Sequence, residues 1–155
     1  MFETIVWATD GSELADRALP HVLELAKMHH SKIVAVHANE LLKGRFGGAP
    51  LLADEPDLRE KVEKQVAEVR EQGLPIELKV ITGTHDVPEL IARAAREAEA
   101  DLIVVGTHGH GGFKAAVLGS VARGLLHDAS CPVLAIPPAR EVVVAERERE
   151  LVTTV

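Results

Sequence analysis

The chain of 155 residues is long enough to form one ordinary domain with a substantial hydrophobic core. Its 17 Lys and Arg residues against 24 Asp and Glu residues give a net charge of −7. This balance excludes nucleic acid as the main partner, because no basic surplus exists to displace counterions. No long uncharged apolar stretch predicts a membrane span, and the single Cys131 cannot form an internal disulfide, so we expect a cytoplasmic protein without a membrane partner.

The chain opens with a predicted strand followed by a predicted helix. The apolar run Thr4–Ala8 is too short for a helix and rich in strand formers, so it predicts a strand buried on both faces. Ser12 is a good N-cap, and the 3.6-residue period after it predicts an amphipathic helix over residues 13–29. Pro20 lies inside this helix and should bend it or remove one backbone hydrogen bond.

The rest of the chain repeats this alternation of strand and helix. Residues 41–56 are rich in Gly and Pro and predict a mobile loop or lid with some local helix. Strands alternating with helices predict an α/β fold, an open parallel sheet of five strands with helices on both faces. The further predicted strands are residues 33–38, 76–81, 102–105 and 133–136, and the further predicted helices are residues 57–72 (stopped by Gly73), a helix capped by Thr84 or Asp86, and residues 117–127.

A glycine-rich turn follows the apolar run at residues 102–105. Glycine lets the backbone approach an anion closely, and the N–H groups at a helix start point at it, so this turn is typical of a phosphate site. The turn is not a P-loop, because no Gly-Lys pair occurs in the chain, and it is not a Rossmann turn, because Lys114 stands in place of the third glycine. The spacing is G-x2-G-x9-G-S, formed by Gly106, Gly109, Gly119 and Ser120.

This spacing, with the ending SCPVLAIP at residues 130–137, resembles the nucleotide-binding branch of the universal stress protein family. The resemblance implies a domain over residues 1–138 and a C-terminal tail over residues 139–155. It also partly underlies the strand order that we expect, 3-2-1-4-5, as in Rossmann-like and adenine nucleotide alpha hydrolase-like folds. In that order the chain reverses between the first and fourth strands, and ligands bind at such a reversal, outside the carboxyl ends of the strands.

The resemblance implies an adenine nucleotide as the ligand, ATP first, with any Mg²⁺ held by the phosphates. Local sequence alone leaves Asp10 open between a turn aspartate and a ligand, whereas the resemblance places Asp10 near the nucleoside. It places the glycines against the ribose and phosphates, with His108 near the phosphates. It also implies that backbone groups of Ala8 and Ala38 line the adenine edge and that Val105 packs on the base or ribose. The residues implied as nucleotide contacts are Ala8, Thr9, Asp10, Ala38, Val105, Gly106, His108, Gly109, Gly119, Ser120 and Val121.

We expect a stress-response or regulatory module that is not an enzyme, since no P-loop lysine or arginine finger stands in the motif. A slow ATPase, a member that binds cyclic AMP or no nucleotide, and a flavodoxin-like or response-regulator domain stay open as alternatives. His108 and His110 are too few ligands for a structural zinc site, so we expect no metal site. The resemblance implies a homodimer through the fifth strand's edge, to which the tail could add contacts.

Overall fold

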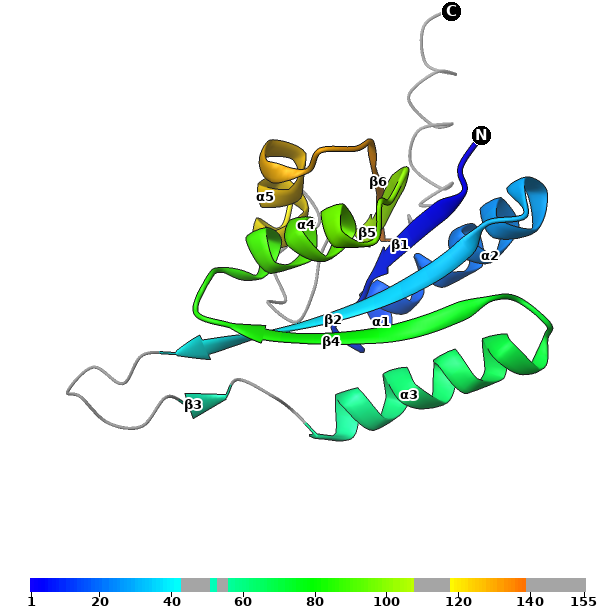
Figure 1. Cartoon of the computed structure of the whole chain (residues 1–155). Helices are drawn as coiled ribbons and strands as arrows, with labels where there is room; N and C mark the ends of the chain where they lie inside the picture. The colour runs from blue at the N-terminus through cyan, green and yellow to red at the C-terminus, as the bar shows by residue number, and fades with distance from the viewer. Residues whose placement is uncertain (43–50, 53–55, 108–117, 139–155) are drawn as a thin grey trace, which may run out of the picture.

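The computed structural model describes residues 1–42, 51–52, 56–107 and 118–138 (Figure 1). Five parallel strands form its sheet in the order β4-β2-β1-β5-β6. Counted among the parallel strands alone, this is the order 3-2-1-4-5, so the predicted fold class and strand order are confirmed. The strands are β1 (Thr4–Ala8), β2 (Lys32–Leu42), β4 (Ile76–Gly83), β5 (Leu102–Gly106) and β6 (Val133–Ile136).

The strand order reverses at β1, which lies in the middle of the sheet. Ala8 at the end of β1 is in register with Val36 of β2 on one side and with Val105 of β5 on the other. The chain runs outward from β1 to β2 and β4, and then crosses to β5 and β6 on the opposite side. The carboxyl ends of β1 and β5 are therefore neighbours at the topological switch point, where α/β sheets bind ligands.

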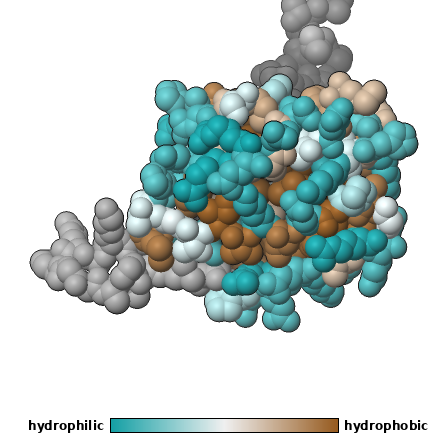
Figure 2. All heavy atoms as spheres, in the orientation of Figure 1, coloured by the Kyte–Doolittle hydropathy of each residue, from teal (hydrophilic) through white to brown (hydrophobic). Residues whose placement is uncertain are grey.

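Helices cover both faces of the sheet (Figure 1). On one face, α1 (Glu13–Asp16), α2 (Leu19–His29) and α3 (Pro56–Glu71) enclose a core around Trp7, which is fully buried. On the other face, α4 (Val87–Glu97) and α5 (Ser120–Asp128) pack over a second core around Leu90. Figure 2 shows polar side chains over the outer helices and apolar ones gathered between them, as the burial of a sheet on both faces requires.

The predicted continuous helix over residues 13–29 was wrong, because the structure divides it into α1 and α2. Pro20 has no N–H to donate to the carbonyl of Asp16, and its ring would clash there, so α1 ends at Asp16. Pro20 then occupies the first turn of α2, where proline is favoured. The sequence predicted that Pro20 would bend this helix or remove one backbone hydrogen bond, whereas the structure shows two separate helices.

The predicted loop with local helix at residues 41–56 was also wrong in its described parts. β2 continues to Leu42 because its ladder with β4 runs on to the pair Glu40↔Gly83. A short strand, β3 (Leu51–Leu52), pairs antiparallel with its end. The lid that we predicted there falls on residues 43–50 and 53–55, which lie outside the described residues.

The helix predicted over residues 117–127 begins later than expected. Gly119 has an extended ψ of 156° and is the N-cap, so α5 starts at Ser120. Gly119 and Ser120, which the prediction put inside the helix, therefore stand at its beginning. This shift places Ser120 and Val121 in the first turn of α5, at the carboxyl-terminal edge of the sheet.

Candidate functional site

The loop after β1 is ordered by hydrogen bonds from its own backbone. Thr9 continues the ladder to β2 through its N–H, which donates to the Val36 carbonyl at 3.0 Å. The Thr9 hydroxyl oxygen accepts from the Gly11 N–H at 3.1 Å, and Asp10 Oδ1 accepts from the Ser12 N–H at 2.9 Å. Asp10 therefore lies two residues after the end of β1, half-buried, with its carboxylate oriented by the Ser12 N–H.

Behind this loop lies His37 of β2, which is 5% exposed. Its Nδ1 lies 3.1 Å from the Thr9 carbonyl oxygen. A carbonyl can only accept, so Nδ1 carries the proton in this contact. His37 is thus a hydrogen-bonded core histidine that fixes the Thr9 peptide from inside the sheet.

The turn from β5 into α5 forms the other half of the candidate site. The Thr107 N–H donates to the Ile136 carbonyl at 2.8 Å, and the Gly119 N–H donates to the Thr107 carbonyl at 2.7 Å. These two bonds pin both ends of the glycine turn to the sheet edge. His108 and Gly109, predicted as contacts, lie outside the described residues.

The first turn of α5 has no side-chain cap in the described part of the chain. Gly119 at the N-cap offers no side-chain oxygen to the N–H groups of the first turn, which usually accept one from Ser, Thr, Asp or Asn. Those N–H groups lie at the positive end of the helix dipole. This helix start therefore suits an anion, as the motif predicts.

The remaining predicted contacts lie at the strand ends between the two loops. Ala8 and Val105 are 3% and 5% exposed, with side chains in the core beneath α4 and α5. Ala38 is half-buried against the same core. Gly106 ends β5 beside Val105 and is buried. These positions can therefore offer mainly backbone groups at the sheet edge, and Val105 exposes little side-chain surface there.

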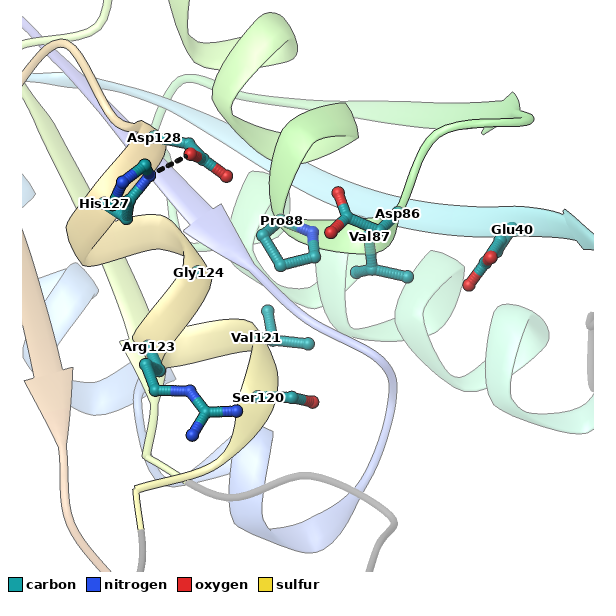
Figure 3. Close-up of a pocket in the computed structure, with 10 residues that line it drawn as sticks. All are labelled: Glu40, Asp86, Val87, Pro88, Ser120, Val121, Arg123, Gly124, His127 and Asp128. Carbon is teal, nitrogen blue, oxygen red and sulfur yellow. Dashed lines mark hydrogen bonds and ion pairs between the residues drawn. The ribbon is translucent and has the colours of Figure 1, made fainter.

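A cavity of about 520 Å³ opens beside Ser120 and Val121 (Figure 3). It lies between α5, the start of α4 and the end of β2, and its volume is within the range of small-molecule sites. Pro88 of α4 forms one wall, and Gly124 lets α5 approach it closely. A Cβ on Gly124 would lie 2.5 Å from the Pro88 Cγ atom, so the cavity wall depends on this glycine.

The charges around this cavity are unevenly distributed. Arg123 is the one Lys or Arg among its described lining residues, and its guanidinium points toward the first turn of α5 in Figure 3. The carboxylates of Glu40, Asp86 and Asp128 lie on the other walls. Asp128 accepts from His127 Nδ1 at 2.7 Å and raises the pKa of this exposed histidine. An anionic group is therefore favoured at the Ser120–Arg123 end, and a hydrogen-bond donor at the carboxylate walls.

Sequence patterns did not identify Glu40 or Arg123 as pocket residues. The strand prediction stopped at residue 38, two positions before Glu40. Arg123 follows Ser120 by three residues, a spacing that places both on one helix face once α5 is known to start at Ser120. Within the described ranges, no cluster of His, Cys, Asp and Glu could hold a metal ion, and no helix is long and apolar enough to cross a membrane.

The fold defines an open α/β protein, and its candidate site lies at the carboxyl-terminal edge of the parallel sheet, at the switch point. The family model described as "Universal stress protein family" matches residues 1–137, and the chain belongs to this family.

Individual relatives match over most of the chain. A universal stress protein of Thermus aquaticus is 36% identical, over 88% of this chain and 99% of the relative. A solved structure of a family member from Burkholderia pseudomallei is 32% identical with a TM-score of 0.64, covering 88% of this chain and 96% of that one. The universal stress protein of Archaeoglobus fulgidus in complex with dAMP is 26% identical with a TM-score of 0.62, covering 88% and 98%.

Proposed function

We propose that this protein binds an adenine nucleotide, ATP first, at the carboxyl ends of β1, β2 and β5. The observation that carries this proposal is the start of α5, which has no side-chain cap, lines the 520 Å³ cavity and is joined to the end of β5 by the hydrogen bond from Gly119 to Thr107. The sequence contains the whole motif of Gly106, Gly109, Gly119 and Ser120, of which the structure describes Gly106, Gly119 and Ser120. The Archaeoglobus fulgidus relative in complex with dAMP supports the adenine nucleotide as the ligand class.

The charge distribution supports one orientation of the nucleotide. The phosphates belong at the first turn of α5, which offers backbone N–H groups and the Ser120 hydroxyl and toward which the Arg123 guanidinium points. The carboxylate walls would repel phosphates, but the Glu40 carboxylate at the end of β2 can accept a hydrogen bond from an amino group. Any Mg²⁺ would be held by the phosphates, with assistance from Asp10, which is the one carboxylate in the predicted contact set.

In this proposal the bound nucleotide acts as a regulatory signal in a stress-response module, rather than as a substrate for rapid hydrolysis. The motif contains no P-loop lysine, and the role of Arg123 would be to bind phosphate. Phosphate release by the wild type well above that of Gly109→Val would instead establish ATPase activity. We place this module in the cytoplasm, in line with its acidic composition and single cysteine.

The partner that we propose is a second copy of the chain, joined along β6. Among the described strands β6 pairs only with β5, so its outer edge offers unpaired backbone groups, and Leu134 on it is 38% exposed. Residues 139–155, which could extend this contact, lie outside the described residues. Sedimentation velocity of the full chain checks this arrangement, and a monomer at all concentrations would refute it.

Nucleotide binding is tested by denaturing protein purified without added ligand, identifying any nucleotide released, and titrating the emptied protein with MgATP. We expect an adenine nucleotide in the released fraction and saturable ATP binding. Gly109→Val should abolish binding while the thermal melt is retained, because Gly109 belongs to the motif. Gly112→Val, in the same turn but outside the motif, is the matched control and should bind more tightly than Gly109→Val. A wild-type protein that releases no nucleotide and does not bind ATP refutes the proposal.

A further inference from the structure

Helix α3 contacts the loop that carries Asp10, although some 50 residues separate them in sequence. Lys61 Nζ donates a hydrogen bond of 2.8 Å to the Gly11 carbonyl and forms an ion pair with Asp16 of α1. Gln65, one turn further along α3, donates from Nε2 to Asp16 Oδ1 at 2.9 Å. The side chains of Lys61 and Asp16 are 38% and 26% exposed, so these contacts are partly shielded from water.

The backbone of Gly11 fits closely against α3. Its φ of +77° is in the left-handed region that glycine adopts without strain. A Cβ at this position would lie 2.9 Å from the Leu58 carbonyl oxygen, so α3 meets the loop where no side chain could fit. The contact between α3 and this loop is therefore both directional and close-packed.

One peptide group links Lys61 to Asp10. The carbonyl of Gly11 and the N–H of Ser12 belong to the same planar trans peptide, in which they point in opposite directions. Lys61 holds the carbonyl end, and Asp10 Oδ1 accepts from the N–H end at 2.9 Å. By fixing the Gly11 carbonyl toward α3, Lys61 directs the Ser12 N–H toward the Asp10 carboxylate. The orientation of this carboxylate is set by that N–H.

We propose that Lys61 is a positioning residue for nucleotide binding, which acts through the Gly11–Ser12 peptide on Asp10. This inference rests on the proposed function and adds to it a link between the site and α3, on the opposite face of the sheet from the cavity. Asp16 keeps the Lys61 ammonium in place, and Gln65 holds Asp16. Neither the motif nor the predicted contacts include any of these three residues.

Isothermal titration of the full chain with MgATP and with AMP tests this role. Lys61→Met keeps the aliphatic stem and removes the charge. It should weaken the affinity for both nucleotides roughly tenfold, which corresponds to about 1.4 kcal/mol of binding free energy. Both should be affected because Asp10 is assigned to the nucleoside, which they share. Lys61→Arg should restore most of the affinity, and Lys64→Met, at an exposed lysine of the same helix, should leave it unchanged. Lys61→Gln serves in place of Lys61→Met if the latter does not fold.

Repeating the titrations in an Asp10→Ala background separates positioning from a general structural role. If Lys61 acts through Asp10, Lys61→Met causes no further loss in that background. An equal loss with and without Asp10, or unchanged affinity in Lys61→Met, overturns the role of Lys61 while wild-type binding upholds the proposed function. A wild type that binds neither nucleotide overturns both.

Discussion

The two faces of the sheet hold the two halves of the candidate site by different means. On the α1–α3 face, directional polar contacts fix a loop, chiefly from Lys61 to Gly11 and Asp16. On the α4–α5 face, the cavity wall rests on shape, because Gly124 and Pro88 approach with no side chain between them. Hydrogen bonds set the orientation of a peptide, whereas close packing sets the distance between two helices. Substitutions on the two faces should therefore fail in different ways.

The largest effect that we expect comes from Gly11→Ala on the α1–α3 face. The new methyl group would meet the Leu58 carbonyl, which belongs to the helix backbone and cannot move aside alone. The left-handed φ of Gly11 adds strain of its own. Together, backbone strain and overpacking should lower the free energy of unfolding by about 3 kcal/mol. Urea denaturation followed through the single Trp7, which is buried in this face's core, measures the loss.

Gly73→Ala is the matched control for that substitution. Gly73 ends α3 with a φ of +80°, almost that of Gly11, but a Cβ there has nothing within 4 Å. It should show the backbone strain alone, about 1 kcal/mol. Equal losses in the two variants would mean that the contact with α3 does not constrain the Gly11 loop.

On the α4–α5 face, Gly124→Ala should destabilise the protein by about 1–2 kcal/mol. Overpacking against the rigid Pro88 ring, whose Cγ atom would lie 2.5 Å from the new Cβ, costs about 2–3 kcal/mol, in the upper part of the usual range, and the better helix propensity of alanine offsets about 1 kcal/mol of it. Adding Pro88→Ala should recover part of the lost stability by removing the ring. Thermal denaturation of Gly124→Ala, of Pro88→Ala and of the double variant measures both effects. A single Gly124→Ala variant as stable as the wild type would show that the two helices can separate at no cost.

Much of this architecture could be predicted because its signals are local. The run at 133–136 marked β6 to the residue, and Gly73 marked the end of α3. Where a second interaction competed with the local signal, the prediction failed. The helical period crossed Pro20 without a break, and the apolar pattern of β2 ended before its ladder with β4 did.

The same distinction between local and long-range signals applies to the candidate site. Asp10 and Gly106 stand at or just after the ends of predicted strands, and the strand order that the family resemblance partly supplied predicted that these ends meet at one edge of the sheet. Lys61 could not be found in this way, because α3 shows only which of its faces is apolar, and Lys61 flanks that stripe beside Val62. Which carbonyl its ammonium reaches depends on how α3 docks against a loop 50 residues away. Arg123 is a milder case, since only the start of α5 was misplaced.

The smallest effect on stability that we expect comes from Asp101. Its carboxylate accepts backbone hydrogen bonds at the amino end of β1, as the Asp10 carboxylate does just beyond the carboxyl end of that strand. Asp101 Oδ2 accepts from the N–H groups of Thr4 at 2.9 Å and Glu3 at 2.7 Å, and these bonds lower the pKa of the carboxyl below its ordinary value. Because the folded-state pKa is depressed, the stabilisation is complete above the unfolded pKa, about 4, and is lost as the pH falls through the folded value.

Asp101→Asn should therefore melt at a slightly lower temperature than the wild type at neutral pH, and the gap should narrow as the pH is lowered below about 4. Thermal melts of both proteins across this range measure it, and a gap that widens in acid would contradict the depressed pKa. MgATP affinity should not change, because Asp101 lies at the edge of the sheet away from the site. A loss of affinity equal to that of Asp10→Ala would mean that nucleotide binding depends on the whole of β1 rather than on the orientation of one carboxylate.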